Sequence, residues 1–201
     1  MTALQMIGRG LRRIGQFSGR DTLSQFWIYA GSVIGLAMAA WAAVFMPFFF
    51  GTLARMQRFA AEHPDQAEVV SGPGSYSVTI HGDHPELMPD MAALLPPLAV
   101  ITSIAVILLA GAVTRRLHDR DKRGYLGIPP LVFLAAGMAI MPGVFDSFST
   151  SAASAEAAEM GMIGLLFLNN LLYLGSLAVL VFHLTQRGTK GPNRFGEDPR
   201  G

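Results

Sequence analysis

Four long stretches of the chain are almost entirely apolar, and polar segments separate them. They run from about 26 to 53, 91 to 114, 128 to 145 and 160 to 184. A helix needs roughly 20 residues to cross about 30 Å of hydrocarbon. Gly and Pro within these stretches argue little against helix, because lipid offers the backbone no other hydrogen-bond partner. The pattern predicts an all-α integral membrane protein with four transmembrane helices.

Apolar and basic positions also alternate with helical spacing before the first stretch. The apolar positions recur every three or four residues: Leu4, Ile7, Leu11, Ile14 and Phe17. Arg9, Arg12 and Arg13 stand between them. This spacing predicts a short amphipathic helix on the inner leaflet, with its arginines near anionic headgroups. A cleaved signal peptide is the alternative for the first stretch, but such a peptide has an apolar run of only about 7–15 residues.

The segment from 54 to 90 has a different pattern and is expected to form the first outer loop. Within it, "EVVSGPGSYSVTIHG" alternates apolar and polar residues on both sides of a Gly-Pro-Gly turn. Alternation around such a turn is typical of a β-hairpin. A small hairpin and an irregular loop are the two structures that this segment permits.

Composition supports the membrane assignment. Hydrophobic residues make up 51% of the 201 residues and charged residues only 14%, whereas soluble domains average about a quarter charged. Lipid rather than water is therefore expected to face much of a single membrane domain that spans residues 1–201. The chain has no cysteine, which excludes disulfides and cysteine-based zinc sites.

The basic residues lie on one side of the predicted spans. Thirteen of the 15 fall in the N-terminal segment, the loop 115–127 or the tail 185–201: Arg9, Arg12, Arg13, Arg20, Arg115, Arg116, Arg120, Lys122, Arg123, Arg187, Lys190, Arg194 and Arg200. Arg55 and Arg58 are the exceptions, and nine of the 14 acids fall in the opposite loops. Because segments rich in Lys and Arg stay in the cytoplasm, we expect both termini to be cytoplasmic.

Three motifs stand on this basic side. They are "FSGRDTLSQFW" (17–27), "RRLHDRDKRGY" (115–125) and "GTKGPNRFGEDP" (188–199). In order and content they resemble the YhaH-type family of small bacterial inner-membrane proteins, which is classed as a domain of unknown function. The matching positions are Phe17, Gly19, Arg20, Phe26, Trp27, Arg115, Arg116, Leu117, His118, Asp119, Gly124, Gly188, Gly191, Asn193, Phe195, Gly196, Asp198 and Pro199. The resemblance implies four helices in the inner membrane and no known activity.

The chain departs from the family pattern at four of these motif positions. Leu23 and Gln25 stand where the pattern has Arg and Glu, and Arg123 and Tyr125 stand where it has Ser and Trp. If the Arg and the Glu pair in the family, both partners are replaced together here, so no unpaired charge is left.

The charged run at 115–123 is the main candidate for chemistry. His118 and Asp119 are adjacent, so on a helix they point about 100° apart and do not form a base with its orienting partner. Together with Asp121 they offer three metal ligands, but five cations in the same run oppose a divalent ion. Two interpretations stay open. His118 and Asp119 could hydrogen-bond Arg20, Arg116 or the tail and lock this end together, or Arg115 and Arg116 could hold a lipid phosphate bidentately.

The other polar positions indicate structural roles. The third motif lacks the G-x-x-x-x-G-K-[ST] spacing of a phosphate loop and predicts successive turns anchored by Phe195 on the membrane surface. Within the spans, Asn169 and Asn170 are expected to hydrogen-bond neighbouring helices. The spans contain none of the Asp, Glu, Lys or Arg residues that ion pathways normally use, and His183 lies near the inner edge of the fourth.

These patterns favour a non-enzymatic inner-membrane module whose basic cytoplasmic cap binds anionic lipid headgroups or a protein partner. A small oligomeric transporter or channel is the first alternative, and an enzyme acting on lipid headgroups is the second. We expect no cofactor, no metal and no nucleic acid, and homo-oligomerisation stays open. The candidate contact residues of the cap are Arg20, Arg115, Arg116, His118, Asp119, Asn193 and Arg194.

Overall fold

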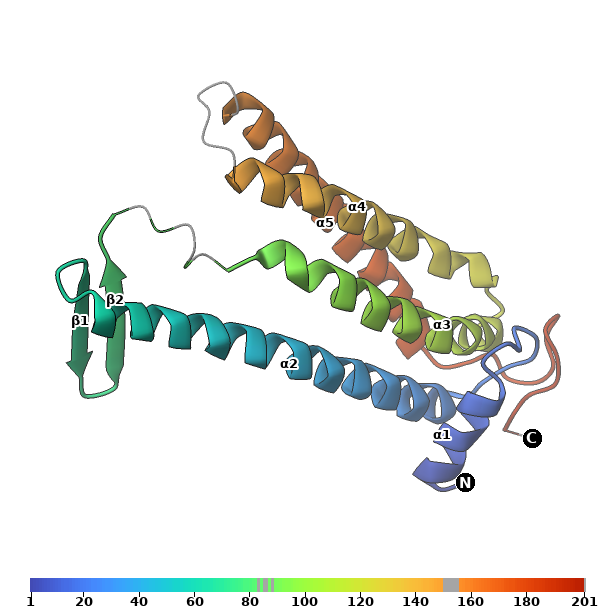
Figure 1. Cartoon of the computed structure of the whole chain (residues 1–201). Coiled ribbons are helices and arrows are strands. Elements are labelled where there is room, and N and C mark those ends of the chain that lie inside the picture. Colours follow the sequence, from blue (N-terminus) through green and yellow to red (C-terminus); the bar gives the residue numbers. More distant parts are fainter. Residues whose placement is uncertain (83, 85–86, 88, 150–155, 201) are drawn as a thin grey trace.

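The computed structural model describes residues 1–82, 84, 87, 89–149 and 156–200. It is mostly helical, with one small two-stranded sheet. Four helical segments are long and apolar enough to cross a membrane: Leu23–Glu62, Met91–Asp119, Gly124–Phe145 and Met160–Thr185. The chain termini lie together at one end of these helices, and the sheet lies at the other end (Figure 1). Asp83 and Glu86, two acids of the expected outer loop, are outside the described residues.

The first helix is the predicted amphipathic one. Helix α1 (Ala3–Arg12) begins with a capping box, in which Thr2 and Gln5 each accept a hydrogen bond from the other's backbone N–H. It lies crosswise to the next helix (Figure 1) and is buried there at Gly10, where a Cβ would come within 2.3 Å of the Tyr29 ring. The helix is shorter than the apolar spacing suggests: it ends at Arg12, so Ile14 and Phe17 lie beyond it.

Helix α2 (Leu23–Glu62) is much longer than the span predicted within it. A second capping box, made by Thr22 and Gln25, begins the helix. Its 40 residues extend for about 60 Å at 1.5 Å per residue, twice the thickness of the hydrocarbon. Residues 54–62, expected as the start of the outer loop, are therefore helical. Nothing between Gly51 and Pro64 breaks the helix, which ends at Glu62 because a proline restricts the backbone of the residue before it, here His63.

The predicted β-hairpin is confirmed at the far end of α2. Strands β1 (Ala67–Gly72) and β2 (Ser75–Ile80) pair antiparallel, with Gly72 opposite Ser75 and Ala67 opposite Ile80. This register leaves Pro73 and Gly74 as a two-residue turn, and Gly74 takes a φ of +84°, which costs glycine nothing. The Gly-Pro-Gly sequence therefore sets the register of the sheet.

Helix α3 (Leu95–Asp119) follows a short 3-10 turn, η2 (Met91–Leu94). It includes "RRLHD", which the sequence alone placed in a loop, because a specific motif ends the helix only after Asp119. The N–H of Asp121 donates to the His118 carbonyl, and the N–H of Lys122 donates to the Leu117 carbonyl at 2.9 Å. These are the two bonds of a Schellman motif, with Asp121 at φ +54° in the position that glycine usually takes.

The last two helices form an antiparallel pair. A 3-10 turn, η3 (Gly124–Gly127), leads into α4 (Ile128–Ser149), which packs along α5 (Glu156–Thr185). Asn169 of α5 is buried and donates to the Phe133 carbonyl of α4 at 3.0 Å, as expected. Asn170 differs from the prediction: it is exposed and donates to Leu166 of its own helix.

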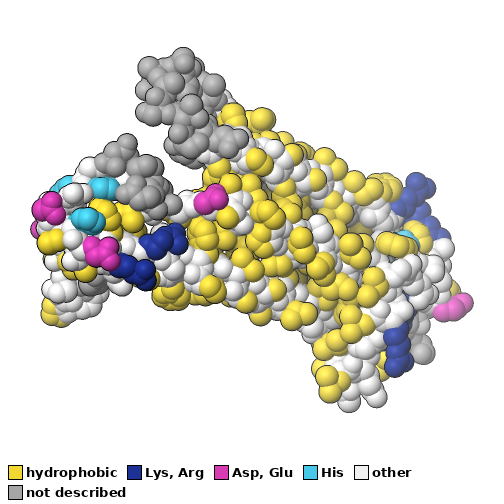
Figure 2. All heavy atoms as spheres, in the orientation of Figure 1, with side chains coloured by type: hydrophobic (Ala, Val, Ile, Leu, Met, Phe, Trp, Pro, Cys, Tyr) yellow, Lys and Arg dark blue, Asp and Glu magenta, His cyan; other side chains and the backbone are white. Residues whose placement is uncertain are grey.

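The buried apolar core lies near the end where the chain termini meet. Its members come from α2, α3 and α5: Phe26, Tyr29, Ala30, Val33, Ala112, Leu117, Leu180 and Leu184. Further along the helices apolar side chains cover the visible surface, and the Lys and Arg side chains in view gather at its two ends (Figure 2). The helices thus share a buried core at one end, and along most of their length their apolar side chains are exposed.

Candidate functional site

The three motifs of the basic side meet in one assembly at the end where the termini lie. We call it the cap: residues 1–22, the last turn of α3 with the following residues 120–123, and the tail 186–200. Its centre is a cluster of five charged residues that are at most 5% exposed: Arg20, Asp21, Arg115, Arg116 and Asp119. Charges as deeply buried as these are costly unless each is paired and hydrogen-bonded.

Asp119 is the acceptor at the centre of this cluster. One carboxylate oxygen accepts from Nε and Nη2 of Arg20 at 3.1 and 3.0 Å, and the other accepts from Nη1 of Arg116 at 2.5 Å. Its backbone carbonyl accepts from the N–H of Thr189 at 2.8 Å. Asp119 therefore joins the start of α2, the end of α3 and the tail.

Asp21 holds the second group of arginines. Its Oδ2 accepts from Nε of Arg115 at 2.7 Å, and its Oδ1 accepts from Arg13 at 3.0 Å and lies 3.7 Å from Nη2 of Arg9. Burial lowers the pKa of the Arg13 guanidinium; Asp21 opposes that shift, and Arg115 and Arg9 add to it. One carboxylate is thus shared by three cations.

The three buried arginines also bind backbone carbonyls where helices end. Arg115 donates to the carbonyls of Arg13 and Gln16, just after α1. Arg116 donates to the carbonyls of Leu184 and Gln186, where α5 ends. A cation at a helix C-terminus satisfies carbonyls that have no partner within the helix and interacts favourably with the helix dipole.

Arg20 makes the corresponding contacts with the tail. Its Nη1 donates to the Gly191 carbonyl at 2.7 Å, and its Nη2 donates to the Thr189 carbonyl at 2.7 Å. Gly188 allows the tail to approach, because a Cβ there would lie 1.9 Å from Oδ2 of Asp119. Gly188 of the third motif thus leaves the space that the Asp119 side chain of the second motif occupies.

His118 and the tail form the outer layer of the cap. The imidazole stacks on Phe195 with ring centroids 3.8 Å apart and planes within 4° of parallel, and its Nδ1 lies 3.3 Å from the Gly19 carbonyl. Asn193 donates to the His118 carbonyl at 3.0 Å. Arg194 lies over Phe195 and bonds to Asp121. Phe195 is therefore anchored on His118, whereas the sequence suggested an anchor on the membrane surface.

The structure thus brings all seven candidate residues into one cap, but it changes what two of them can do. Arg115 and Arg116 are 1% and 0% exposed, and their donors bind aspartates and backbone carbonyls. Their guanidinium groups have no open face for a lipid phosphate, which corrects the expectation that they hold one bidentately. Of the other interpretation, the part made by Asp119 is present, since Asp119 binds Arg20 and Arg116. His118 differs from it: its ring bonds neither arginine, lies against the Gly19 carbonyl and stacks on Phe195 of the tail.

Sequence reasoning missed the roles of two residues at this end, Asp21 of the cap and Gln25 in the first turn of α2. Asp21 occupies a position that the family pattern leaves open, although its place just before the Thr22 capping box was a signal that it lies at the helix entrance. Gln25 stands where the family has Glu, and it closes that capping box, a role that either side chain can fill. The presence of Gln in place of Glu at position 25 therefore preserves the start of α2.

The same residues offer no metal centre. His118 faces Phe195 and Gly19, Asp119 faces two arginines, and Asp121 faces Arg194. Across the described part of the chain, no group of three His, Asp or Glu side chains comes together as metal ligands would. The arrangement can hold helix ends in place and present cations to an anion.

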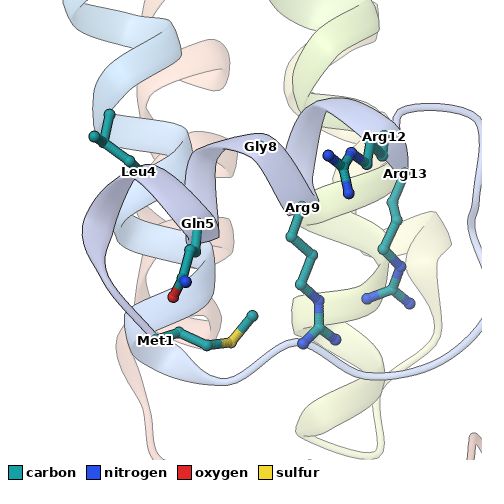
Figure 3. Close-up of a pocket in the computed structure, with 7 residues that line it drawn as sticks. All are labelled: Met1, Leu4, Gln5, Gly8, Arg9, Arg12 and Arg13. Carbon is teal, nitrogen blue, oxygen red and sulfur yellow. The ribbon is translucent and has the colours of Figure 1, made fainter.

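An open hollow of about 680 Å³ lies beside α1 (Figure 3). Its lining comes from α1 and the residues next to it: Met1, Leu4, Gln5, Gly8, Arg9, Arg12 and Arg13. The side chains of Gln5, Arg9 and Arg13 extend from the same side of the helix (Figure 3). Arg9 and Arg13 connect this hollow to the buried cluster through Asp21.

Replacing Asp119 with Asn should destabilise the protein strongly, because it leaves Arg20 and Arg116 buried without a counter-charge. Removing one partner of a buried ion pair costs about 3–5 kcal/mol. The matched control is Asp121→Asn, which breaks an exposed pair worth about 0–1 kcal/mol and keeps a residue that tolerates positive φ. Thermal unfolding of both variants in mild detergent is the measurement, and equal midpoints would refute the central role of Asp119.

Replacing Phe195 with Ala should loosen the tail while the rest of the cap stays folded. The change removes the stack on His118, and an aromatic pair contributes about 1 kcal/mol beyond its buried area, equivalent to roughly fivefold more opening. Trypsin cleavage after Lys190 should accelerate by about that factor. Phe17→Ala, at a side chain that is 52% exposed, should leave the rate unchanged, and equal rates in both variants would contradict the anchoring role.

The comparison with known families agrees with the arrangement of the motifs. No curated protein and no solved structure matches the chain significantly. One family model does match, described as "Protein of unknown function (DUF805)", and it covers residues 14–197, a range that contains the first two motifs, residues 188–197 of the third and the four long helices of the described chain. The match agrees with the expected domain of unknown function and does not bear on the narrower YhaH-type name. The chain belongs to the DUF805 family of proteins of unknown function.

Proposed function

We propose that this chain is a non-enzymatic protein of the bacterial inner membrane, with both termini in the cytoplasm, whose cap binds the anionic headgroups of the inner leaflet. Four helices able to span a membrane and a family of unknown function fit a multi-pass membrane protein. The cytoplasmic termini and the anionic headgroups are the further parts that we propose. One observation carries it: exposed cations and exposed apolar side chains stand side by side on the cap.

The exposed cations of the cap are distinct from the buried ones. Five of them are exposed and make no side-chain hydrogen bond or ion pair among the described residues: Arg12, Lys122, Arg123, Arg187 and Lys190. Each Lys or Arg near an anionic leaflet contributes about 1 kcal/mol of attraction, screened over roughly 10 Å at moderate ionic strength. Together they supply a positive surface that does not depend on Arg115 and Arg116.

Exposed apolar side chains on the same end support contact of that surface with the headgroup region. Leu4, Leu11, Phe17, Tyr125 and Ile128 are between 48% and 81% exposed. Large apolar groups next to arginines are typical of helices that lie in the membrane interface, and tyrosine is enriched there. The cap therefore combines the two features that hold a protein surface against anionic lipid.

The proposed orientation predicts the locations of two reporters. A reporter fused after Gly201 should be cytoplasmic, and one inserted near Gly72, in the turn of the hairpin, should lie outside. The reason is the 13-to-2 division of basic residues between the two sides, since basic segments are retained inside. Reporters found on the same side would contradict the four-span topology, and exchanged locations would contradict its orientation.

The proposed ligand predicts which lipid stays with the purified protein. The parent should retain phosphatidylglycerol or cardiolipin over phosphatidylethanolamine in mild detergent, measured by native mass spectrometry. Replacing Lys122, Arg123, Arg187 and Lys190 with Gln should reduce the retained anionic lipid severalfold. These four exposed side chains leave the buried cluster intact, so the unfolding midpoint should not change and serves as the control. Equal anionic lipid on parent and variant would refute the headgroup-binding role of this surface.

A further inference from the structure

The cap has more positive charge than its acids can balance. Arg9, Arg13 and Arg115 share Asp21, and Arg20 and Arg116 share Asp119. Among the described contacts no third carboxylate bonds to any of these five arginines. Unbalanced charge is costly where water is scarce, so a further anion at the accessible edge of the cluster would stabilise it.

The hollow beside α1 is the accessible edge. The Arg9 and Arg13 side chains are 32% and 19% exposed, whereas those of Arg20, Arg115 and Arg116 are at most 1% exposed. A guanidinium has five N–H donors. The ion pair of Arg9 with Asp21 and the hydrogen bonds of Arg13 to Asp21 and Gln16 leave several of these donors unused. Arg12, with no partner among the described residues, lines the hollow as well.

Gly8 makes room for a ligand between these arginines and an apolar edge. A Cβ at Gly8 would meet no atom within 4 Å, and Leu4 and Met1, 81% and 67% exposed, lie on the hollow's lining. The close-up shows Gly8 between Leu4 and Arg9 along the helix (Figure 3). Cationic and apolar groups on one small surface match a molecule with a phosphate next to a hydrocarbon chain.

We propose that this hollow is a discrete site for one anionic phospholipid molecule, its phosphate held by Arg9, Arg12 and Arg13 and its upper acyl chain lying against Leu4. The site rests on the proposed function and deepens it, because it replaces general attraction to a charged surface with one located ligand. Arginine suits the task because its planar fork matches phosphate oxygens bidentately. The bound phosphate also adds the missing negative charge beside Asp21.

The test separates this site from the surrounding charge with two matched pairs of variants. Gly8→Leu places a side chain in the hollow from a position where a Cβ meets no atom within 4 Å, and leucine favours a helix over glycine. Gly15→Leu is its control, since a Cβ there also meets open space outside the hollow. Arg12→Gln removes one cation from the site, and Arg123→Gln removes one exposed cation elsewhere. Each full-length protein is titrated in mild detergent with phosphatidylglycerol, and occupancy of the first lipid is measured by native mass spectrometry.

We expect one tight phosphatidylglycerol on the parent and on both controls. Binding should be about tenfold weaker in Arg12→Gln, the effect of losing one charge-assisted hydrogen bond, and at least as much weaker in Gly8→Leu. Phosphatidylcholine with the same acyl chains should bind more weakly than phosphatidylglycerol. Inorganic phosphate at the same concentration should not displace the lipid, because it gains nothing from Leu4.

The outcomes distinguish the site from the general proposal. If the parent binds phosphatidylglycerol but Gly8→Leu and Arg12→Gln match their controls, the discrete site is overturned and the general surface attraction stands. If the parent binds no phosphatidylglycerol in preference to phosphatidylcholine, both proposals fail. Displacement by inorganic phosphate would overturn the lipid as the occupant. An unchanged unfolding midpoint in Gly8→Leu shows that weaker binding comes from the filled hollow and not from a lost helix.

Discussion

The carboxylate of Asp119 between two buried arginines is the interaction on which the arrangement of this protein depends. It is 1% exposed, and it accepts from Arg20 at the entrance to α2 and from Arg116 one turn before it in α3. Burying a charge is favourable only when partners satisfy it on all sides. This requirement fixes the geometry of the surroundings: Gly188 must lack a side chain, and Thr189 must follow it to bond to the Asp119 backbone.

The three buried arginines connect the centre of the cap to the ends of the helices. Each of the three buried guanidinium groups pairs with an aspartate on one side and with backbone carbonyls on another. Those carbonyls belong to the residues after α1, the end of α5 and the tail. Helix ends have carbonyls without partners, and a buried polar group without a hydrogen bond is costly. A single cluster thus satisfies three chain segments that would otherwise need water, and it explains why Arg115 and Arg116 of the second motif are buried.

The sequence predicts the membrane helices and the hairpin because both depend on patterns that are local. Apolar length is enough to identify a span, and Gly-Pro-Gly between alternating residues makes a hairpin one of the two structures expected for the outer loop. The helical character of "RRLHD" depends instead on the Schellman motif, which requires Asp121 at positive φ, a conformation that propensity assigns to glycine first. The burial of Arg115 and Arg116 was also beyond local reasoning, because their partners lie 94 residues away at Asp21 and 68 residues away at Leu184. A charged run taken alone predicts a solvated loop. Its burial is evident only from the acids and carbonyls that surround it in the fold.

Polar bonds at the cap, more than apolar packing, specify how the helices are placed. Only 6–11% of the residues in the apolar stretch of each candidate span are buried within the chain. Apolar contact between helices also gains little in lipid, since the lipid tails are equally apolar. Helices α2 and α3 pack together, as do α4 and α5, whereas the contacts that join the two pairs are sparse. The bonds of Arg116 to Asp21, Asp119 and Leu184 connect elements of both pairs at one point. Because these bonds are concentrated there, a ligand that changes the charge balance of the cap would act on a region where α2, α3 and α5 are held together.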